Sequence, residues 1–410
     1  MSSIIENRQI TVGVTGSIAA YKIVDVVSKL VQQGAVVDVA MTSAAVNFIS
    51  PLTFQSLTGR EPYVDMWGVH GVKGEAHIEL ARRTELMLIA PATASTMASL
   101  AHGFADDFVT LTALATKAPL LISPAMDSQM WDHDATQANL KLLRERGAHF
   151  IGPEQGRLAS GQIGTGRLSE SQKIIATMKA CLGKLEGDFS GKTVIVTAGG
   201  TREAIDPVRY IGNRSSGKMG NALAEAARDR GADVVLITTV PETAPEAIQV
   251  IPVESANEME SSISDYVTKA EVLVMAAAVA DYRVNMESEQ KIKREHMKSF
   301  SLDLIANKDI IASIDANLIK VAFAAETEDL ITNAKKKLRD KNVDLVIANS
   351  VTGEASAFGS DTNKITIVDN QGNAEELPVL SKYICAMEIL DRISNLVGAD
   401  SYKEEGSSSN

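Results

Sequence analysis

The chain has 410 residues, of which 45% are hydrophobic and 22% charged, and its formal net charge at pH 7 is -12. This hydrophobic content is more than one ordinary core needs and indicates two α/β domains of similar size. The charges are mixed in sign along the chain, without a basic run, which argues against nucleic acid or an anionic membrane surface as the main partner. Anionic substrates must therefore be held by local sites.

The cysteines and the start of the chain point to a cytoplasmic protein. Cys181 and Cys385 are far apart and have no histidine cluster nearby, so neither a disulfide framework nor a thiolate metal site is indicated. Residues 1–9 are polar and lack an apolar signal core, and no later apolar stretch is long enough to cross a bilayer. We therefore expect neither export nor a membrane span.

Apolar, β-branched runs alternate with amphipathic stretches in the first half of the chain. This alternation predicts right-handed βαβ units and a parallel sheet covered on both faces by helices. The expected strands of this half are residues 10–14, 36–41, 86–90 and 120–123.

A polar, glycine-containing stretch over residues 185–192 predicts a domain junction, giving domains 1–190 and 191–400. The second half repeats the α/β pattern, with a helix expected over residues 221–230. Residues 401–410 are charged or small, so we predict a disordered tail. The expected strands of the second half are residues 193–197, 234–238, 272–277, 321–325 and 345–348.

Gly16, Ser17 and Ile18 join the first strand to a helix, where free N–H groups and the helix dipole favour a phosphate. The segment is not a G-x-G-x-x-G fingerprint, and the second strand ends at Thr42 without an acidic residue, which disfavours a nicotinamide dinucleotide. Taken alone, the glycines are also compatible with a simple tight turn. Residues 90–96 and 123–131 follow two further strands, and ligands of open α/β sheets bind at such strand ends.

Together these motifs resemble the family of cysteine decarboxylases that bind flavin mononucleotide (FMN). The resemblance implies a flavodoxin-like or Rossmann-like flavoprotein domain. It also implies that FMN is bound by Gly16, Ser17, Ile18, Thr42, Pro91, Ala92, Thr93 and Thr96.

Residues 76–80 match the family's A-H-I-E-L segment, in which the histidine is the catalytic base, and this implies the same role for His77. A pKa near neutrality suits proton transfer. A structural histidine is the alternative for this residue taken alone.

Two positions depart from the family pattern. Asp127 stands where an asparagine amide would bind the substrate carboxylate, and an ionised Asp127 would repel that group unless its pKa is raised until it is protonated. Ser160 replaces a flap cysteine that is the proposed proton donor, and a hydroxyl is a poorer acid than a thiol. Either both replacements are tolerated, or the domain binds flavin but decarboxylates slowly or stops at the ene-thiol.

The second domain opens with a candidate nucleotide site. Residues 212–218 satisfy G-x-x-x-x-G-K, but Met219 replaces the serine or threonine that would bind magnesium, and the preceding strand is absent, so we reject a P-loop. Ser215 and Gly217 nevertheless begin a helix, which is good geometry for a phosphate.

Residues 209–220 are similar to the ligase signature R-Y-I-x-N-x-S-S-G-K-M-G, and residues 10–397 resemble the bifunctional phosphopantothenoylcysteine decarboxylase/phosphopantothenate–cysteine ligase family. The resemblance implies a Rossmann-like ligase domain in which Asn213 handles an acyl-cytidylate. Ser215 and Gly217 would approach the phosphates of cytidine triphosphate (CTP). A turn role is the alternative for Asn213 alone.

Further CTP contacts are implied along this domain. Asp281 would orient the ribose or hold Mg²⁺ between phosphates, although an isolated aspartate after a strand is more often a cap. Lys291 begins a loop, ending at Arg294, that matches the family's K-x-K-K pattern, and its charge would stabilise the phosphates. The other implied contacts are Met275, Ala276, Ala277, Lys308, Asp309, Ile310, Ile311, Phe323, Lys337 and Lys341. The lysine-rich run 335–341 is also compatible with an ordinary helical surface.

The resemblance implies coenzyme A biosynthesis from 4′-phosphopantothenate, cysteine and CTP, with Mg²⁺ and FMN as cofactors. Ligation would give phosphopantothenoylcysteine, and decarboxylation would then give 4′-phosphopantetheine. By analogy we expect a homo-oligomer. The intact ligase motif disfavours an interaction protein as the alternative. The missing dinucleotide fingerprint disfavours a nicotinamide oxidoreductase.

Overall fold

The structure, a computed structural model, describes residues 3–66, 75–293, 299–326, 329–350 and 359–407. The chain divides into two compact units, residues 2–182 and 183–410. The division falls within helix α8 (Ser171–Glu186), earlier than the predicted junction after residue 190. The last turn of α8 belongs to the second unit because Gly183 packs on it: a Cβ on Gly183 would meet the carbonyl oxygen of Asp229 at 2.6 Å.

The first unit, in its described residues, contains a five-stranded parallel sheet in the order β2-β1-β3-β4-β5, which is a flavodoxin-like order. The strands are β1 (Gln9–Val14), β2 (Val36–Met41), β3 (Leu86–Ala92), β4 (Leu120–Pro124) and β5 (His149–Phe150). The other helices are α1 (Ala20–Gln32), α2 (Pro51–Thr58), α3 (Ala76–Arg83), α4 (Ala94–His102), α5 (Phe108–Ala115), α6 (Ser128–Trp131) and α7 (Asp134–Glu145). An antiparallel hairpin joins β6 (Glu154–Arg157) and β7 (Ile163–Arg167).

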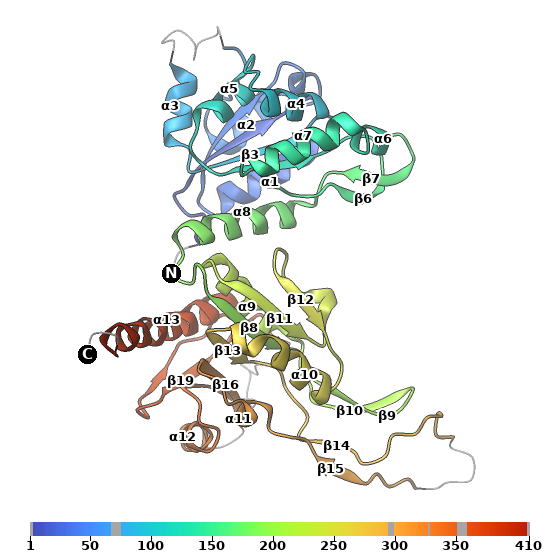
Figure 1. The fold of residues 1–410 in the computed structure, drawn as a ribbon, viewed down its shortest axis with the longest axis vertical. Helices are drawn as coiled ribbons and strands as arrows, with labels where there is room; N and C mark the ends of the chain where they lie inside the picture. Colours follow the sequence, from blue (N-terminus) through green and yellow to red (C-terminus); the bar gives the residue numbers. More distant parts are fainter. Residues whose placement is uncertain (1–2, 67–74, 294–298, 327–328, 351–358, 408–410) are drawn as a thin grey trace. The chain divides into compact units, whose positions relative to one another are not determined.

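Helices cover both faces of this sheet, as the alternation of the sequence predicts (Figure 1). Residues of α1, α2 and α8 pack on one face, where Val12 and Leu30 are fully buried. Residues of α4, α5 and α7 pack on the other, where Ile89 and Met97 are fully buried. Each strand therefore buries both of its faces, which explains why the predicted strands are almost continuously apolar.

The second unit, where described, contains an eight-stranded sheet in the order β12-β11-β8-β13-β16-β17-β19-β20. Its strands are β8 (Thr193–Ala198), β11 (Asp233–Thr238), β12 (Gln249–Pro252), β13 (Val272–Met275), β16 (Ile319–Glu326), β17 (Leu345–Ser350), β19 (Ile365–Asp369) and β20 (Ala374–Glu376). The helices are α9 (Lys218–Asp229), α10 (Ala256–Tyr266), α11 (Ile310–Ser313), α12 (Leu330–Asp340) and α13 (Lys382–Ser407).

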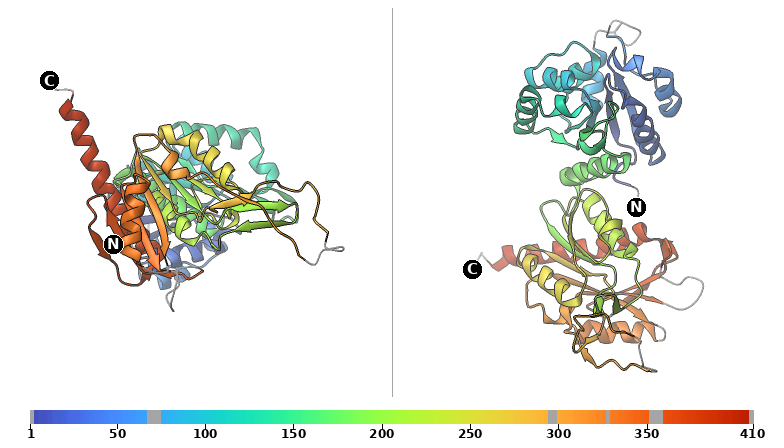
Figure 2. Two further views of the ribbon diagram at one scale, coloured as in Figure 1. Left: turned by 90° about the horizontal axis from the view of Figure 1, so that it is seen from below. Right: turned by 90° about the vertical axis from the view of Figure 1, so that its right-hand side faces the viewer.

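The strands β12 to β17 are parallel and follow the Rossmann order, whereas β19 and β20 are antiparallel additions at one edge. Helices α9 and α13 pack on one face, and α10 and α12 on the other (Figures 1 and 2). Both units are thus three-layer α/β structures, and the predicted fold class is confirmed.

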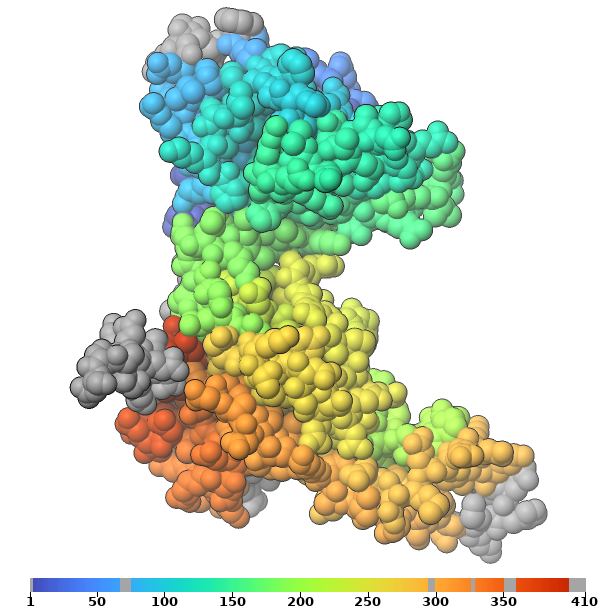
Figure 3. Space-filling view, viewed as in Figure 1, coloured from blue at the N-terminus to red at the C-terminus, as the bar shows by residue number. Residues whose placement is uncertain are grey.

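Short antiparallel pairs were not predicted. They are β9 (Arg202–Asp206) with β10 (Arg209–Gly212), β14 (Tyr282–Val284) with β15 (Leu304–Ala306), and β18 (Thr362–Asn363) with β21 (Leu380–Ser381). The β9–β10 and β14–β15 pairs lie together and form an arm that stands out from the body of the second unit (Figures 1 and 3).

The last helix also differs from the prediction, because α13 continues to Ser407 where a disordered tail was expected. The backbone can continue the helix here because Lys403, Glu404 and Glu405 are good helix formers and no proline interrupts the segment.

Candidate active sites

The flavin site predicted in the first unit lies where the sheet order reverses. The chain leaves β1 toward β2 on one side, whereas β3 continues to β4 on the other, and ligands bind at the carboxyl ends of strands at such a switch point. Ser17 follows β1, Thr42 follows β2, and Thr93 follows β3. The structure therefore brings the three predicted segments to one edge of the sheet.

The turn after β1 is closely packed. A Cβ on Gly16 would meet the Cβ of Ala44 at 2.5 Å, so only glycine fits there. Ala19, the N-cap of α1, makes no side-chain hydrogen bond to the helix. The N–H groups of Ala20 and Lys22 donate to the carbonyl oxygens of Ser17 and Ala19. What suits the phosphate of FMN here is the partial positive charge at the start of α1.

Thr15, which the sequence reasoning did not single out, ties β1 to β3. Its hydroxyl is buried, donates to the carbonyl oxygen of Pro91 at 2.6 Å and accepts from the N–H of Thr93 at 3.2 Å. The hydroxyls of Thr93 and Thr96 lie 3.0 Å apart. A threonine at the end of an apolar strand was the available signal, because buried hydroxyls need partners.

Asp127 and Ser160 contact each other directly. The Ser160 hydroxyl donates to the Asp127 carboxylate at 2.7 Å, and the N–H of Gln129 donates to the same carboxylate at 3.1 Å. These hydrogen bonds, chiefly that from Ser160, lower the pKa of Asp127. Of the two alternatives left open by the sequence, the structure thus favours an ionised Asp127 over one with a raised pKa, because the carboxylate is hydrogen-bonded and only half-buried.

The β6–β7 hairpin, which carries the flap, is docked beside Asp127. The N–H of Met126 donates to the carbonyl oxygen of Gly166 at 3.0 Å. A Cβ on Gly166 would approach the carbonyl oxygen of Met126 to 2.2 Å, so this contact requires glycine. The close packing explains how Ser160, 33 residues further along the chain, reaches Asp127.

His77 is the second residue of α3 and is half-buried. In the part of the chain that the structure describes, it makes no hydrogen bond to Asp127 or Ser160. Its role as the base stays a prediction.

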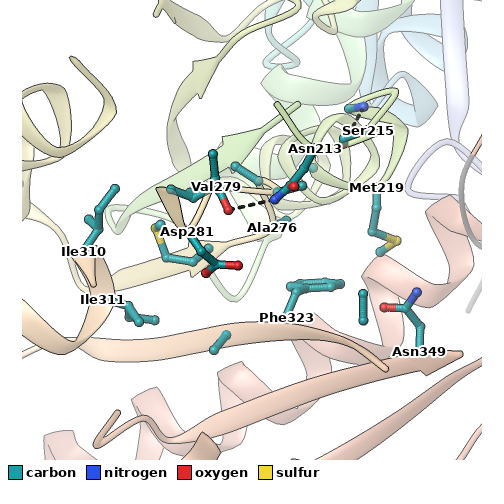
Figure 4. A pocket seen from close by; sticks show the side chains of 18 of the residues that line it. Asn213, Ser215, Met219, Ala276, Val279, Asp281, Ile310, Ile311, Phe323 and Asn349 are labelled. Atoms are coloured by element: carbon teal, nitrogen blue, oxygen red, sulfur yellow. Dashed lines mark hydrogen bonds between the residues drawn. The ribbon is translucent and has the colours of Figure 1, made fainter. Parts of the chain in front are cut away.

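A pocket of about 600 Å³ opens in the second unit at the carboxyl edge of the sheet, beside the start of α9 (Figure 4). It brings together residues that are far apart in the sequence. The lining includes Asn213 and, with the exception of Lys291, every predicted CTP contact: Ser215, Gly217, Met275, Ala276, Ala277, Asp281, Lys308, Asp309, Ile310, Ile311, Phe323, Lys337 and Lys341.

Asn213 is held over this pocket by its own amide. Its Nδ2 donates to the carbonyl oxygen of Val279 at 2.9 Å (Figure 4). The backbone of Asn213 lies close to Gly200. A Cβ added to Gly200 would lie 2.5 Å from the carbonyl oxygen of Asn213. Gly217 is the N-cap of α9, with φ of 72°, and makes no side-chain hydrogen bond. The start of α9 can therefore receive a phosphate.

The pocket lysines are paired within the protein. Lys341 lies 3.0 Å from the Asp309 carboxylate, and Lys308 contacts Glu260. The ammonium of Lys337 donates to the carbonyl oxygen of Phe323 at 2.6 Å. Because the two ion pairs are solvent-accessible, they are weak and can exchange for a phosphate at little cost.

Lys291 lies outside the pocket lining. The adjacent residue Ile292 is tied to the arm, where its N–H donates to Asp206 at 3.1 Å and its carbonyl oxygen accepts from Arg209 at 2.6 Å. These bonds hold the loop beside β9–β10, so the structure does not bring Lys291 to the other CTP contacts. Arg294 lies outside the described residues.

The described residues contain no group of three or more histidine, cysteine or acidic side chains that could hold a metal ion. Asp281 is exposed at the pocket, so a magnesium ion there would take its remaining ligands from phosphates and water. No helix of the described chain is both long and apolar enough to cross a membrane.

Comparisons with known proteins assign both units. Residues 2–183 match the Flavoprotein family, and residues 189–397 match the DNA/pantothenate metabolism flavoprotein C-terminal domain. The chain is 42% identical over 398 residues to the coenzyme A biosynthesis bifunctional protein CoaBC of Bacillus subtilis (strain 168), covering 96% of this chain and 98% of that protein. The chain belongs to this family. The CoaBC protein of Mycobacterium tuberculosis (strain H37Rv) is 40% identical over 405 residues, which is 94% of this chain and 96% of that protein.

Two solved structures are similar to the separate units. The C-terminal domain of a CoaBC protein is 33% identical, with a TM-score of 0.44, over 52% of this chain and 100% of that one. The FMN-dependent cysteine decarboxylase SpaF is 32% identical, with a TM-score of 0.38, over 43% of this chain and 96% of that one.

Membership of the CoaBC family confirms the prediction of a bifunctional enzyme of coenzyme A biosynthesis with a flavoprotein decarboxylase domain and a ligase domain. Both domains match over nearly their full length. The alternative of an impaired flavin domain gains no support from these matches.

Proposed function

We propose that the second unit joins cysteine to 4′-phosphopantothenate at the expense of CTP. The observation that carries this proposal is the single pocket that gathers the predicted nucleotide contacts, with Asn213 at its edge. The phosphates would lie at the start of α9, against Ser215 and Gly217, with the cytidine toward Phe323. Asp281 would hold a magnesium ion shared with the phosphates.

The reaction would proceed in two displacements. A carboxylate oxygen of 4′-phosphopantothenate attacks the α-phosphorus, and the bond from that phosphorus to the bridging oxygen breaks, so pyrophosphate leaves with the electron pair. The amine of cysteine then attacks the acyl carbon, loses a proton and expels cytidine monophosphate. The lysines and N–H groups around the pocket stabilise the charge that builds on the phosphate oxygens.

The ligase proposal is tested by following all products with purified protein. We expect one pyrophosphate and one cytidine monophosphate for each phosphopantothenoylcysteine formed. Release of cytidine monophosphate should cease when 4′-phosphopantothenate is omitted. Hydrolysis of CTP at the same rate without the acid substrate would contradict the proposal.

We propose that the first unit decarboxylates this product to 4′-phosphopantetheine with FMN. The residues that would hold FMN are those at the ends of β1, β2 and β3, and when bound it supplies reversible two-electron oxidation. His77 would accept a proton, and the Asp127–Ser160 pair would lie beside the substrate carboxylate under the flap. Carbon dioxide is the leaving group.

Asp127 should weaken binding of the carboxylate substrate. The pKa of Asp127 lies below the usual value for an aspartate, so the carboxylate is ionised throughout the range from pH 6 to 8. We expect Asp127→Asn to lower the KM for phosphopantothenoylcysteine by about tenfold, since a repulsion is replaced by an amide donor while the acceptor for Ser160 is kept. The ratio of the two KM values should be constant over this pH range. If the KM of the unmodified protein approached that of Asp127→Asn toward pH 6, Asp127 would be protonating in this range and its pKa would be raised.

We also propose a cytoplasmic location, which is supported by Cys181 and Cys385 being free thiols. The homo-oligomeric state stays a prediction.

A further inference from the structure

One end of the ligase pocket is built from residues to which the proposed nucleotide site gives no role. Lys218, Asn363 and Lys382 all line the pocket. They come from the start of α9, from β18 and from the start of α13. Figure 4 shows Met219, the residue after Lys218, near Asn349 on the side of the pocket away from Ile310 and Ile311.

The two lysines lie close together around the segment 359–361. The ammonium of Lys218 donates to the carboxylate of Asp361 at 2.6 Å and to the carbonyl oxygen of Gly359 at 2.9 Å. The ammonium of Lys382 donates to the carbonyl oxygen of Ser360 at 2.5 Å. The side chain of Asp361 is 89% exposed, so water screens its pair with Lys218 and the lysine can exchange it for another anion.

Lys382 is a buried cation that lies beside a second lysine and near the carboxylate of Asp361. The residue is only 6% exposed. Burial lowers the pKa of its ammonium, the nearby charge of Lys218 lowers it further, and the carboxylate of Asp361 partly opposes both effects. An anion bound between the two lysines would offset both effects.

Asn363 supplies an independent sign of a ligand. The residue is 4% exposed, and within the described chain its buried Oδ1 has no hydrogen-bond partner. Buried polar atoms normally have partners, so an unpaired one that lines a pocket indicates a group bound there. The amide can offer its oxygen as an acceptor or, turned over, its nitrogen as a donor.

The starts of α9 and α13 add to this positive field, because the N-terminal end of a helix carries partial positive charge. We propose that Lys218, Lys382 and Asn363 form a subsite for the β- and γ-phosphates of the nucleotide and hold them as they leave as pyrophosphate. The proposal rests on the ligase function proposed above. Lys218 follows Gly217 directly, so phosphates beyond the one at Gly217 reach this end of the pocket.

This placement assigns the lysines a role in the first displacement. When the bond from the α-phosphorus to the bridging oxygen breaks, the electron pair stays on the pyrophosphate, and its negative charge increases. The ammonium of Lys218, exchanged from Asp361, the ammonium of Lys382, and the Asn363 amide turned to present its nitrogen would stabilise that charge. The subsite should therefore affect CTP and pyrophosphate, and should leave cytidine monophosphate, which lacks these phosphates, largely unaffected.

The test is calorimetric titration of the full-length, flavin-loaded protein with inorganic pyrophosphate and with cytidine monophosphate, in the presence of magnesium. We expect Lys218→Gln and Lys382→Gln each to weaken pyrophosphate binding by about tenfold or more, because each removes a charged hydrogen bond. Affinity for cytidine monophosphate should change by less than about threefold. The matched control is Lys336→Gln, which removes a charge from an exposed position of α12 outside the pocket lining.

The variants also distinguish the phosphates of the nucleotide from the phosphate of 4′-phosphopantothenate. Unchanged pyrophosphate affinity in both lysine variants would overturn the proposal. A third titration, with 4′-phosphopantothenate, would also overturn it if the lysine variants lost affinity for that ligand alone. Lys218 is exposed, so Lys218→Gln keeps the test valid if the buried Lys382→Gln fails to fold. Pyrophosphate binding requires no turnover: lysine-dependent binding in a protein without ligase activity would support the subsite and reject the proposed function.

Discussion

Replacing Asn213 by alanine should lower the ligase kcat/KM by about 10²–10³-fold, a loss typical of removing one positioned donor from a charged transition state. Asn213 is held over the pocket by its bond to the carbonyl oxygen of Val279, so the truncated side chain has no substitute nearby. The measurement is the initial rate of pyrophosphate release at varied 4′-phosphopantothenate.

The matched control for this variant is Asn395→Ala, an exposed asparagine on α13 outside the pocket lining, which should keep the rate of the unmodified protein. Flavin absorbance should be the same in both variants, because Asn213 belongs to the second unit. If Asn213→Ala retained the normal rate, the role of this residue in handling the acyl-cytidylate would be wrong.

Replacing His77 by alanine should lower the rate of carbon dioxide release from phosphopantothenoylcysteine by about 10²–10⁴-fold, the usual contribution of a positioned acid or base. The half-buried side chain lies on α3. FMN binding and the ligase rate should both persist. The measurement is single-turnover release of carbon dioxide from protein loaded with FMN.

His102→Ala is the control for the histidine variant. This histidine is exposed at the end of α4 and bonded to Asn139 at 3.1 Å, so its removal should leave the rate within about twofold. A His77→Ala enzyme that decarboxylates normally would return His77 to the structural role considered from the sequence.

Most strands of both sheets were predictable from the sequence because they are buried on both faces. The strands β5, β12, β19 and β20, at or near the sheet edges, and the order of the strands were not predicted. The run 36–41 is apolar except for Asp38, and the run 193–197 is apolar between its two threonines, so both are typical of buried strands in an α/β protein. Since ligands bind at the carboxyl ends of such strands, the predicted CTP contacts converge on one pocket. The short hairpins were missed because their strands have two to five residues and little burial.

The rest of the site depends on contacts between distant residues. The pKa of Asp127 is lowered chiefly by its hydrogen bond from Ser160. The two residues belong to different motifs, and neither motif predicts this contact. Lys291 was placed at the phosphates by its motif, but bonds from Ile292 hold this loop beside the arm. Lys382 begins a helix outside every recognised motif, so only the fold brings it to the pocket.

The central claim is that one chain carries 4′-phosphopantothenate through both steps. The most direct measurement is mass spectrometry of the products formed by purified, yellow protein supplied with 4′-phosphopantothenate, CTP, magnesium and cysteine. We predict 4′-phosphopantetheine as the end product, with phosphopantothenoylcysteine appearing only transiently. Accumulation of phosphopantothenoylcysteine without further conversion would contradict the claim that the first unit carries out the second step.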